Sequence, residues 1–244
     1  MKNKDITIGK TPAYHVYPDD GAKHPGLIVI HEIWGLNEHV KDVANRFAKE
    51  GYSVLAPDLF HDTSFETEVA KGLFEEMHNP ETRDEAQKKM RALFAPIQAP
   101  EFAEKTLAQL DECVNFLLAD EHNNGKLGVI GFCFGGTYAL ALAAADSRIN
   151  ASVPFYGQPL SAEKIPGLAS PVLAFLGEED QGLIASLPAL KEGMQKAGKD
   201  FKAVVYPGAG HAFFNDTNPR MYRPEAAKDA WKKTLDFLAQ TINN

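Results

Sequence analysis

Residues 127–136 (LGVIGFCFGG) decide the fold that this chain predicts. The apolar run that ends at Ile130 is typical of a buried strand, and the Ala- and Leu-rich run from Thr137 to Ala145 favours a helix. Glycines two positions before and after Cys133 leave room for a sharp turn between strand and helix. Such a turn holds a nucleophile at the carboxyl end of a sheet, where a helix N-terminus favours a thiolate. The alternative is that these glycines only permit close packing.

Apolar runs on either side of this stretch predict further strands. They lie at residues 27–30, 53–56, 151–156, 172–176 and 202–206. Amphipathic helical patterns lie between or beyond them, at about 40–48, 107–118 and 231–242. Strands that are apolar on both faces suit a parallel sheet covered by helices. The alternation therefore predicts an α/β fold with a mostly parallel, doubly wound sheet flanked by helices.

The length of 244 residues fits a single domain over 1–244, and no Gly/Ser- or Pro-rich linker divides it. One segment, about 61–100, departs from the strand–helix rhythm, because it carries many charges, several prolines and no strand-like run. We interpret it as one or two amphipathic helices plus loops. An excursion of this kind often borders the pocket above the strand ends, and a solvated surface segment is the alternative.

Charge and cysteine content exclude several classes of protein. The net charge is −8, so a basic face for nucleic acid is not expected. No run approaches the roughly 18 apolar residues of a membrane span, and the charged start Met1–Asp5 does not resemble a signal peptide. The two cysteines indicate a reduced, cytoplasmic protein. Cys113 lies among apolar residues of a predicted helix and is expected to be a small buried side chain.

Two residues downstream of Cys133 complete a candidate triad. In α/β-hydrolases the chain order is nucleophile, acid, histidine, and His211 is the one histidine after Cys133. It stands in a glycine-rich loop after a predicted strand. The acid is expected after the strand at 172–176, where Glu178, Glu179 and Asp180 compete. We choose Asp180, because the spacing Gly-x-x-Asp sets a short carboxylate past the turn.

These residue types support nucleophilic catalysis. A thiol near its free pKa of about 8.5 is mostly protonated at neutral pH, so His211 would take its proton or pair with the thiolate. Asp180 would fix the tautomer of His211 and stabilise its charge. The thiolate would attack a carbonyl carbon while two backbone N–H groups, one of them that of Phe134, hold the oxyanion, each worth roughly 3 kcal/mol. Water would then hydrolyse the thioester.

Four segments together resemble the dienelactone hydrolase family of α/β-hydrolases. They are HEIWG at 31–35, GFCFGG at 131–136, GEED at 177–180 and GHAF at 210–213. The similarity extends from about Ala13 to Leu238, and HEIWG is peculiar to this family. The resemblance implies an α/β-hydrolase fold and a Cys133–His211–Asp180 triad.

The resemblance also implies roles for residues around the triad. Glu32 matches a glutamate that contacts the resting thiol and takes part in its deprotonation when substrate binds. Ile33 N–H matches a second oxyanion donor beside Phe134. Trp34 and Tyr156 resemble pocket-lining residues, although core aromatics are an equal alternative. Arg91 falls in the stretch where the family has one of two arginines that hold the substrate carboxylate.

The second of those arginines follows the catalytic histidine by four positions, where this sequence has Asn215. Arg220 or Arg223 could replace it, or could be plain surface charges. We therefore expect a carboxylic ester hydrolase or lactonase similar to dienelactone hydrolase. The alternatives are a thioesterase or carboxylesterase for another small activated ester, and a non-catalytic binding protein on the same fold.

No cofactor or metal is expected, since the histidines and glutamates of residues 31–39 lack H-E-x-x-H spacing. The partner is expected to be a small ester or lactone, and the chain a monomer or small homo-oligomer, with no nucleic acid and no membrane.

Overall fold

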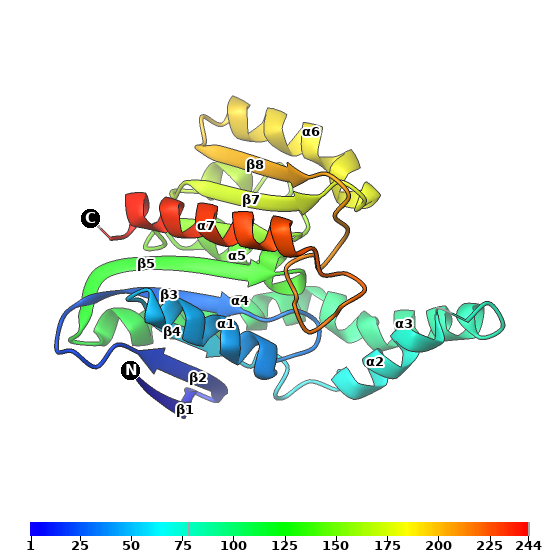
Figure 1. The fold of residues 1–244 in the computed structure, drawn as a ribbon, viewed down its shortest axis with the longest axis horizontal. Coiled ribbons are helices and arrows are strands. Elements are labelled where there is room, and N and C mark those ends of the chain that lie inside the picture. The colour runs from blue at the N-terminus through cyan, green and yellow to red at the C-terminus, as the bar shows by residue number, and fades with distance from the viewer. Residues whose placement is uncertain (78, 244) are drawn as a thin grey trace.

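The centre of the molecule is one eight-stranded sheet with the order β1-β2-β4-β3-β5-β6-β7-β8 (Figure 1). The computed structural model describes residues 1–77 and 79–243. The strands are β1 (Lys2–Ile8), β2 (Thr11–Tyr17), β3 (His24–Ile30), β4 (Ser53–Pro57), β5 (Asn123–Phe132), β6 (Ala151–Phe155), β7 (Val172–Gly177) and β8 (Phe201–Tyr206). Strands β3 to β8 pair in parallel, which confirms the predicted mostly parallel sheet.

The first two strands were not predicted from the sequence. β1 pairs antiparallel with β2, and β2 pairs antiparallel with β4. β1 has the sequence KNKDITI, and Ile8 alone among its side chains is buried. An edge strand pairs on one side only and needs few apolar side chains, so its sequence lacks the apolar run that marks the inner strands.

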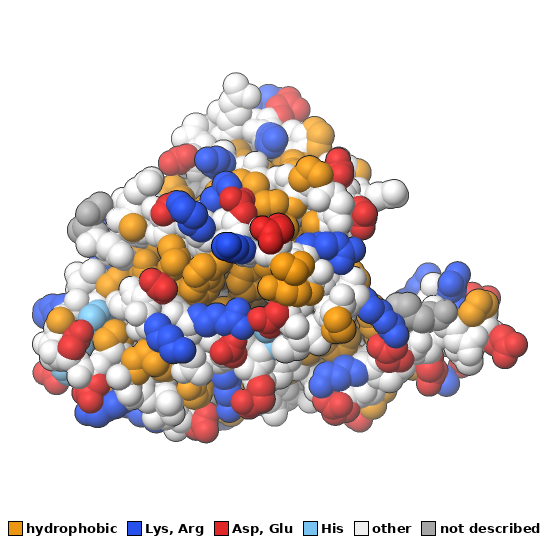
Figure 2. Space-filling model, viewed as in Figure 1, with side chains coloured by type: hydrophobic (Ala, Val, Ile, Leu, Met, Phe, Trp, Pro, Cys, Tyr) orange, Lys and Arg blue, Asp and Glu red, His pale blue; other side chains and the backbone are white. Residues whose placement is uncertain are grey.

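Helices cover both faces of the sheet. In Figure 1, α1 (Glu38–Lys49) and α7 (Pro224–Thr241) lie in front of it, while α4 (Pro100–Ala119) and α5 (Phe134–Ala145) lie behind. Each face has its own apolar layer: Ile130 and Phe132 of β5 belong to the α1–α7 layer, and Leu127 and Val129 belong to the α4–α5 layer. Helix α6 (Gln181–Lys196) packs on β7 and β8, and a short 3₁₀ helix covers Ile165–Gly167. None of the helices in the described residues is long and apolar enough to cross a membrane. Figure 2 shows acidic and basic side chains interspersed over one face of the molecule.

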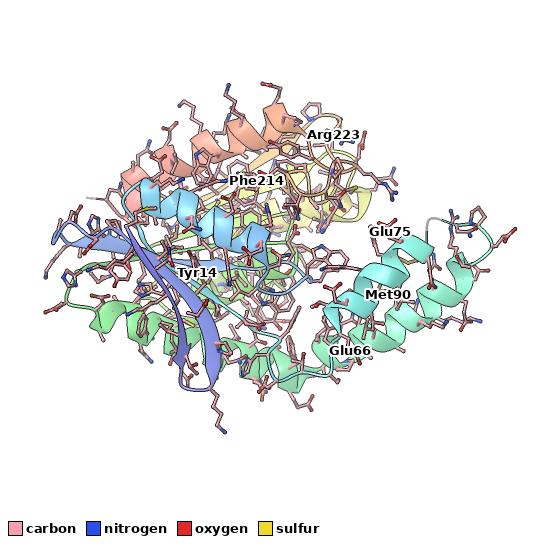
Figure 3. All side chains as sticks on the ribbon, turned by 60° about the horizontal axis from the view of Figure 1, so that its bottom comes forward. Tyr14, Glu66, Glu75, Met90, Phe214 and Arg223 are labelled. Carbon is pink, nitrogen blue, oxygen red and sulfur yellow. The ribbon has the colours of Figure 1, made fainter. Side chains whose placement is uncertain are left out.

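The segment 61–100 contains two helices, α2 (Thr67–Glu76) and α3 (Arg83–Gln98), which project from the body as an arm (Figure 1). Figure 3 shows the arm from another side, with Glu66 at the start of α2, Glu75 near its end and Met90 on α3. Aromatic contacts join the arm to the body. The ring centroids of Phe94 and Phe65 are 5.3 Å apart, and those of Phe65 and Phe60 are 5.0 Å apart.

Candidate active site

Cys133 stands at the turn between β5 and α5 with φ 55° and ψ −111°. A residue that is not glycine adopts such a positive φ at a cost of roughly 1–3 kcal/mol, and residues of this kind cluster at functional sites. Two glycines make the turn possible. A Cβ at Gly131 would lie 1.9 Å from the carbonyl oxygen of Gly135, and a Cβ at Gly135 would lie 2.2 Å from that of Ile30. The Cys133 N–H donates to the Phe155 carbonyl at 3.0 Å, which ties the turn to β6.

A second close approach of backbones brings Asp180 to His211. A Cβ at Gly177 would lie 2.4 Å from the carbonyl oxygen of Ala209, in the loop that carries the histidine. The Glu179 N–H donates to the same Ala209 oxygen at 2.9 Å. The turn after β7 and the loop after β8 therefore lie against each other, and the two side chains meet between them.

His211 Nδ1–H donates to Asp180 Oδ2 at 2.6 Å. Burial lowers the pKa of His211, but hydrogen bonds to Asp180 and Cys133 and the negative charges of both outweigh it and raise the pKa from 6.5 to about 10. The structure thus joins His211 to Asp180 by a hydrogen bond and brings His211 close enough to Cys133 for the two side chains to interact. Glu178 and Glu179, the competing acids, are exposed.

Glu32 is almost completely buried, with 2% of its surface exposed. Tyr156 Oη–H donates to its Oε1 at 3.1 Å, and Asn215 Nδ2 donates to its Oε2 at 2.8 Å. The orientation of the Asn215 amide is fixed because Thr217 donates to Asn215 Oδ1 from its backbone N at 3.0 Å and from Oγ1 at 2.6 Å. Two neutral donors therefore hold the Glu32 carboxylate.

Tyr156 links this carboxylate to the triad. It is 1% exposed, has φ 39°, and its ring centroid lies 5.0 Å from that of His211. Burial, the negative charge of Glu32 and that of Cys133 raise the pKa of Tyr156 well above its usual value, so it donates as a neutral phenol. The structure places it beside the catalytic candidates.

His31, for which the sequence indicated no role, fixes the end of β3. Its Nδ1 donates to the Glu32 carbonyl at 2.6 Å, while its Nε2 accepts from the Leu59 N–H at 3.1 Å. Burial lowers the pKa of His31, so the ring is neutral. It also stacks on the Phe134 ring, with centroids 5.7 Å apart and planes at 12°. His31 therefore holds the backbone at Glu32 against the start of α5.

The two predicted oxyanion donors lie on neighbouring backbone segments. Phe134 is the first residue of α5, so its N–H has no acceptor inside the helix. Gly135 packs on the backbone of Ile30 and His31, since a Cβ at Gly135 would also lie 2.7 Å from the His31 carbonyl oxygen. Ile33 stands two residues after His31. Their role in holding an oxyanion stays a prediction.

Residues 11–242 match the sequence profile of the dienelactone hydrolase family. The chain belongs to this family. It is 34% identical to a "Putative carboxymethylenebutenolidase" of Methylorubrum extorquens, over 95% of this chain and 77% of that protein. It is 35% identical to a protein of the same name from Saccharolobus solfataricus, over 91% of this chain and 96% of that protein. A crystal structure of a "Putative Dienelactone Hydrolase" from Klebsiella pneumoniae covers 98% of each chain with a TM-score of 0.81 and 28% identity.

Family and relatives together indicate a hydrolase of the carboxymethylenebutenolidase or dienelactone hydrolase type. Among the described residues of this dienelactone hydrolase family member, no group of three or more His, Cys, Asp or Glu is arranged to hold a metal ion.

The remaining predicted substrate-binding residues lie apart from one another. Trp34 lines a cleft of about 480 Å³ between α2 and the segment after His211. Arg91 is exposed on α3, in a separate hollow that it shares with Met77, Gln87, Met90, Phe94 and Gln98. None of these six residues lines the Trp34 cleft or belongs to the candidate triad. The structure thus does not bring Arg91 together with the catalytic candidates.

Proposed function

We propose that this hydrolase cleaves an ester or lactone bond with a Cys133–His211–Asp180 triad through a thioester acyl-enzyme. The observation that carries the proposal is the strained Cys133 at the start of α5, which interacts with a histidine that Asp180 holds at 2.6 Å. An orienting carboxylate, a histidine and a partly exposed nucleophile form the arrangement that acyl transfer requires.

The steps follow from the chemistry of these groups. The Cys133 thiolate attacks the carbonyl carbon, and the carbonyl electron pair moves to the oxygen, which the N–H groups of Phe134 and Ile33 hold. The intermediate collapses to a thioester and expels the alkoxide, which His211 protonates. Water then attacks the thioester, His211 takes a proton from it, and the thiolate leaves with the carboxylic acid.

Glu32 is a candidate for a further base because it is a buried carboxylate close to the candidate triad. His211, whose pKa is raised by Asp180 and Cys133, pairs with the Cys133 thiolate once it has formed. The Glu32 carboxylate accepts a hydrogen bond from Tyr156 at 3.1 Å, and the charge of Cys133 is one cause of the raised pKa of Tyr156. Glu32 and Cys133 therefore both lie near the same tyrosine. We propose that Glu32 takes the thiol proton when substrate binds, as the family resemblance implies.

The test is the hydrolysis rate of a Cys133→Ala variant. We expect kcat to fall by at least about 10³-fold, because loss of the nucleophile of a triad costs at least that much. Cys113→Ala is the matched control, because Cys113 is buried in α4 and burial raises its pKa to about 12, so it should be unreactive. Iodoacetamide should accordingly label Cys133 first. Full turnover by Cys133→Ala would refute the triad.

A thioesterase or carboxylesterase for another small activated ester is a second candidate. The observation that favours it is Asn215, which stands where the resemblance expects an arginine and whose amide is occupied by Glu32 and Thr217. A panel of dienelactone, aryl esters and acyl thioesters separates the candidates, and no preference for the carboxylate-bearing lactone supports the second. A binding protein would turn over none of them.

A further inference from the structure

The cleft beside Trp34 has one aromatic wall. The rings of Trp34 and Phe74 meet edge to face, with centroids 5.9 Å apart and planes at 77°. Phe74 belongs to α2 of the arm, so the arm supplies half of this wall. The volume of about 480 Å³ lies within the range of small-molecule sites, roughly 300–1,000 Å³.

The cleft adjoins the catalytic candidates. Asn215 lines it and donates to Glu32 at 2.8 Å, so a group in the cleft is one hydrogen-bonded residue away from that carboxylate. Trp34 directly follows Ile33, whose N–H is a predicted oxyanion donor. A substrate whose carbonyl reaches Cys133 can therefore place its other atoms in the cleft, against the wall that Trp34 and Phe74 form.

The charges around the cleft disfavour an anion. Glu32 carries a buried negative charge that its two donors, both neutral, do not cancel. Two cations line the cleft, and each already faces a carboxylate: Lys71 Nζ lies 2.5 Å from Glu68 Oε1, and Arg220 Nη1 lies 3.2 Å from Glu75 Oε2. A like charge placed near a fixed carboxylate costs binding energy, whereas a neutral ring does not.

We infer that this cleft binds an uncharged aromatic part of the ester or lactone substrate, and that Phe74 sets this preference. The inference rests on the proposed function for its choice of carbonyl substrate. The inference explains what the amide at position 215 does to specificity. With Asn215 in place of an arginine, and with Lys71 and Arg220 each already facing a carboxylate, the cleft has no dedicated partner for a substrate carboxylate.

The test is equilibrium binding of three matched lactones to the Cys133→Ala variant, in which turnover is removed. The lactones are δ-valerolactone, 3,4-dihydrocoumarin, which adds a fused benzene ring, and dihydrocoumarin with a carboxylate on that ring. Titration calorimetry should show that dihydrocoumarin binds at least about tenfold tighter than either of the others, since an aromatic contact contributes on that scale.

Two further variants assign the preference to the cleft. Phe74→Ala, added to Cys133→Ala, should remove most of the advantage of dihydrocoumarin over δ-valerolactone, and Phe74→Leu should leave an intermediate advantage. Val69→Ala is the matched control, because Val69 is exposed on the same helix and outside the cleft. Equal binding of the neutral lactones, tighter binding of the carboxylate form, or an unchanged ratio in both Phe74 variants would overturn the inference. Failure of the triad would appear separately, as retained turnover in Cys133→Ala.

Discussion

The hydrogen bond from Asn215 to Glu32 gives a quantitative prediction about the stability of the site. Glu32 is 2% exposed, so loss of a donor leaves a buried carboxylate oxygen unpaired. A hydrogen bond to a charged group contributes about 1.5–3 kcal/mol, and an unpaired buried partner costs a similar amount. We therefore expect Asn215→Leu to lower the free energy of unfolding by about 2–3 kcal/mol.

A double-mutant cycle separates this bond from general packing. Asn215→Leu and Glu32→Leu each leave partners unpaired, whereas the double variant removes both ends of the 2.8 Å bond. The free energies of unfolding are measured by urea titration at pH 7 with circular dichroism. The change in the double variant should differ from the sum of the two single changes by about 1.5–3 kcal/mol. Additivity within about 0.5 kcal/mol would refute the claim that Asn215 holds Glu32.

Four further predictions concern the turn at Cys133, helix α2 and His211. Gly131→Ala should prevent folding or lower the free energy of unfolding by more than about 4 kcal/mol, because its Cβ would lie 1.9 Å from a backbone oxygen. Gly72→Ala is the contrasting change, because a Cβ at this exposed position of α2 would meet no atom within 4 Å. It should raise the free energy of unfolding by about 0.5–1 kcal/mol, measured by thermal or urea unfolding. Asp180→Asn should lower kcat by roughly 10⁴-fold through loss of the orienting carboxylate. The folded pKa of His211, about 10, lies above the ordinary 6.5, so its contribution to stability is complete below pH 6.5 and is lost as pH rises through 10. The stability difference between wild type and Asp180→Asn should therefore shrink from pH 6 to pH 10, and a constant difference would contradict this.

The inner part of the fold was predictable because its sequence is constrained by burial on both faces. The apolar runs that predicted strands fall within β3 to β8, except that the run at 151–156 extends one residue past β6. The Gly-x-Cys-x-Gly pattern falls where β5 turns into α5. Strand β1 was not predictable because an edge strand tolerates charged residues. Strand β2 was not predictable because its sequence, TPAYHVY, holds a proline and a histidine and lacks a continuous apolar run. Helix α6 was not predicted either. Its buried residues, Leu183, Leu187, Leu190 and Met194, recur at helical spacing, but Pro188 stands inside the helix, where a proline usually ends one.

The candidate site was predictable where backbone geometry demands particular residues. Gly177 and the spacing to Asp180 select the carboxylate that the structure places 2.6 Å from His211. The partners of Glu32 were not predictable in the same way. Asn215 and Tyr156 come from loops far apart in the chain, and an amide in a sequence does not reveal which buried group it will satisfy. Only the three-dimensional packing shows that Asn215 belongs to the site as a support for Glu32.

The central claim is that the reaction passes through a thioester on Cys133. Intact-protein and peptide mass spectrometry after rapid acid quench, during hydrolysis of an aryl acetate, tests it most directly. The account predicts an acetyl adduct on the peptide that contains Cys133. The adduct should form and disappear at least as fast as the enzyme turns over. It should be present in the Cys113→Ala variant and absent in the Cys133→Ala variant. Turnover without any acyl adduct on Cys133, or with the adduct on another residue, would contradict it.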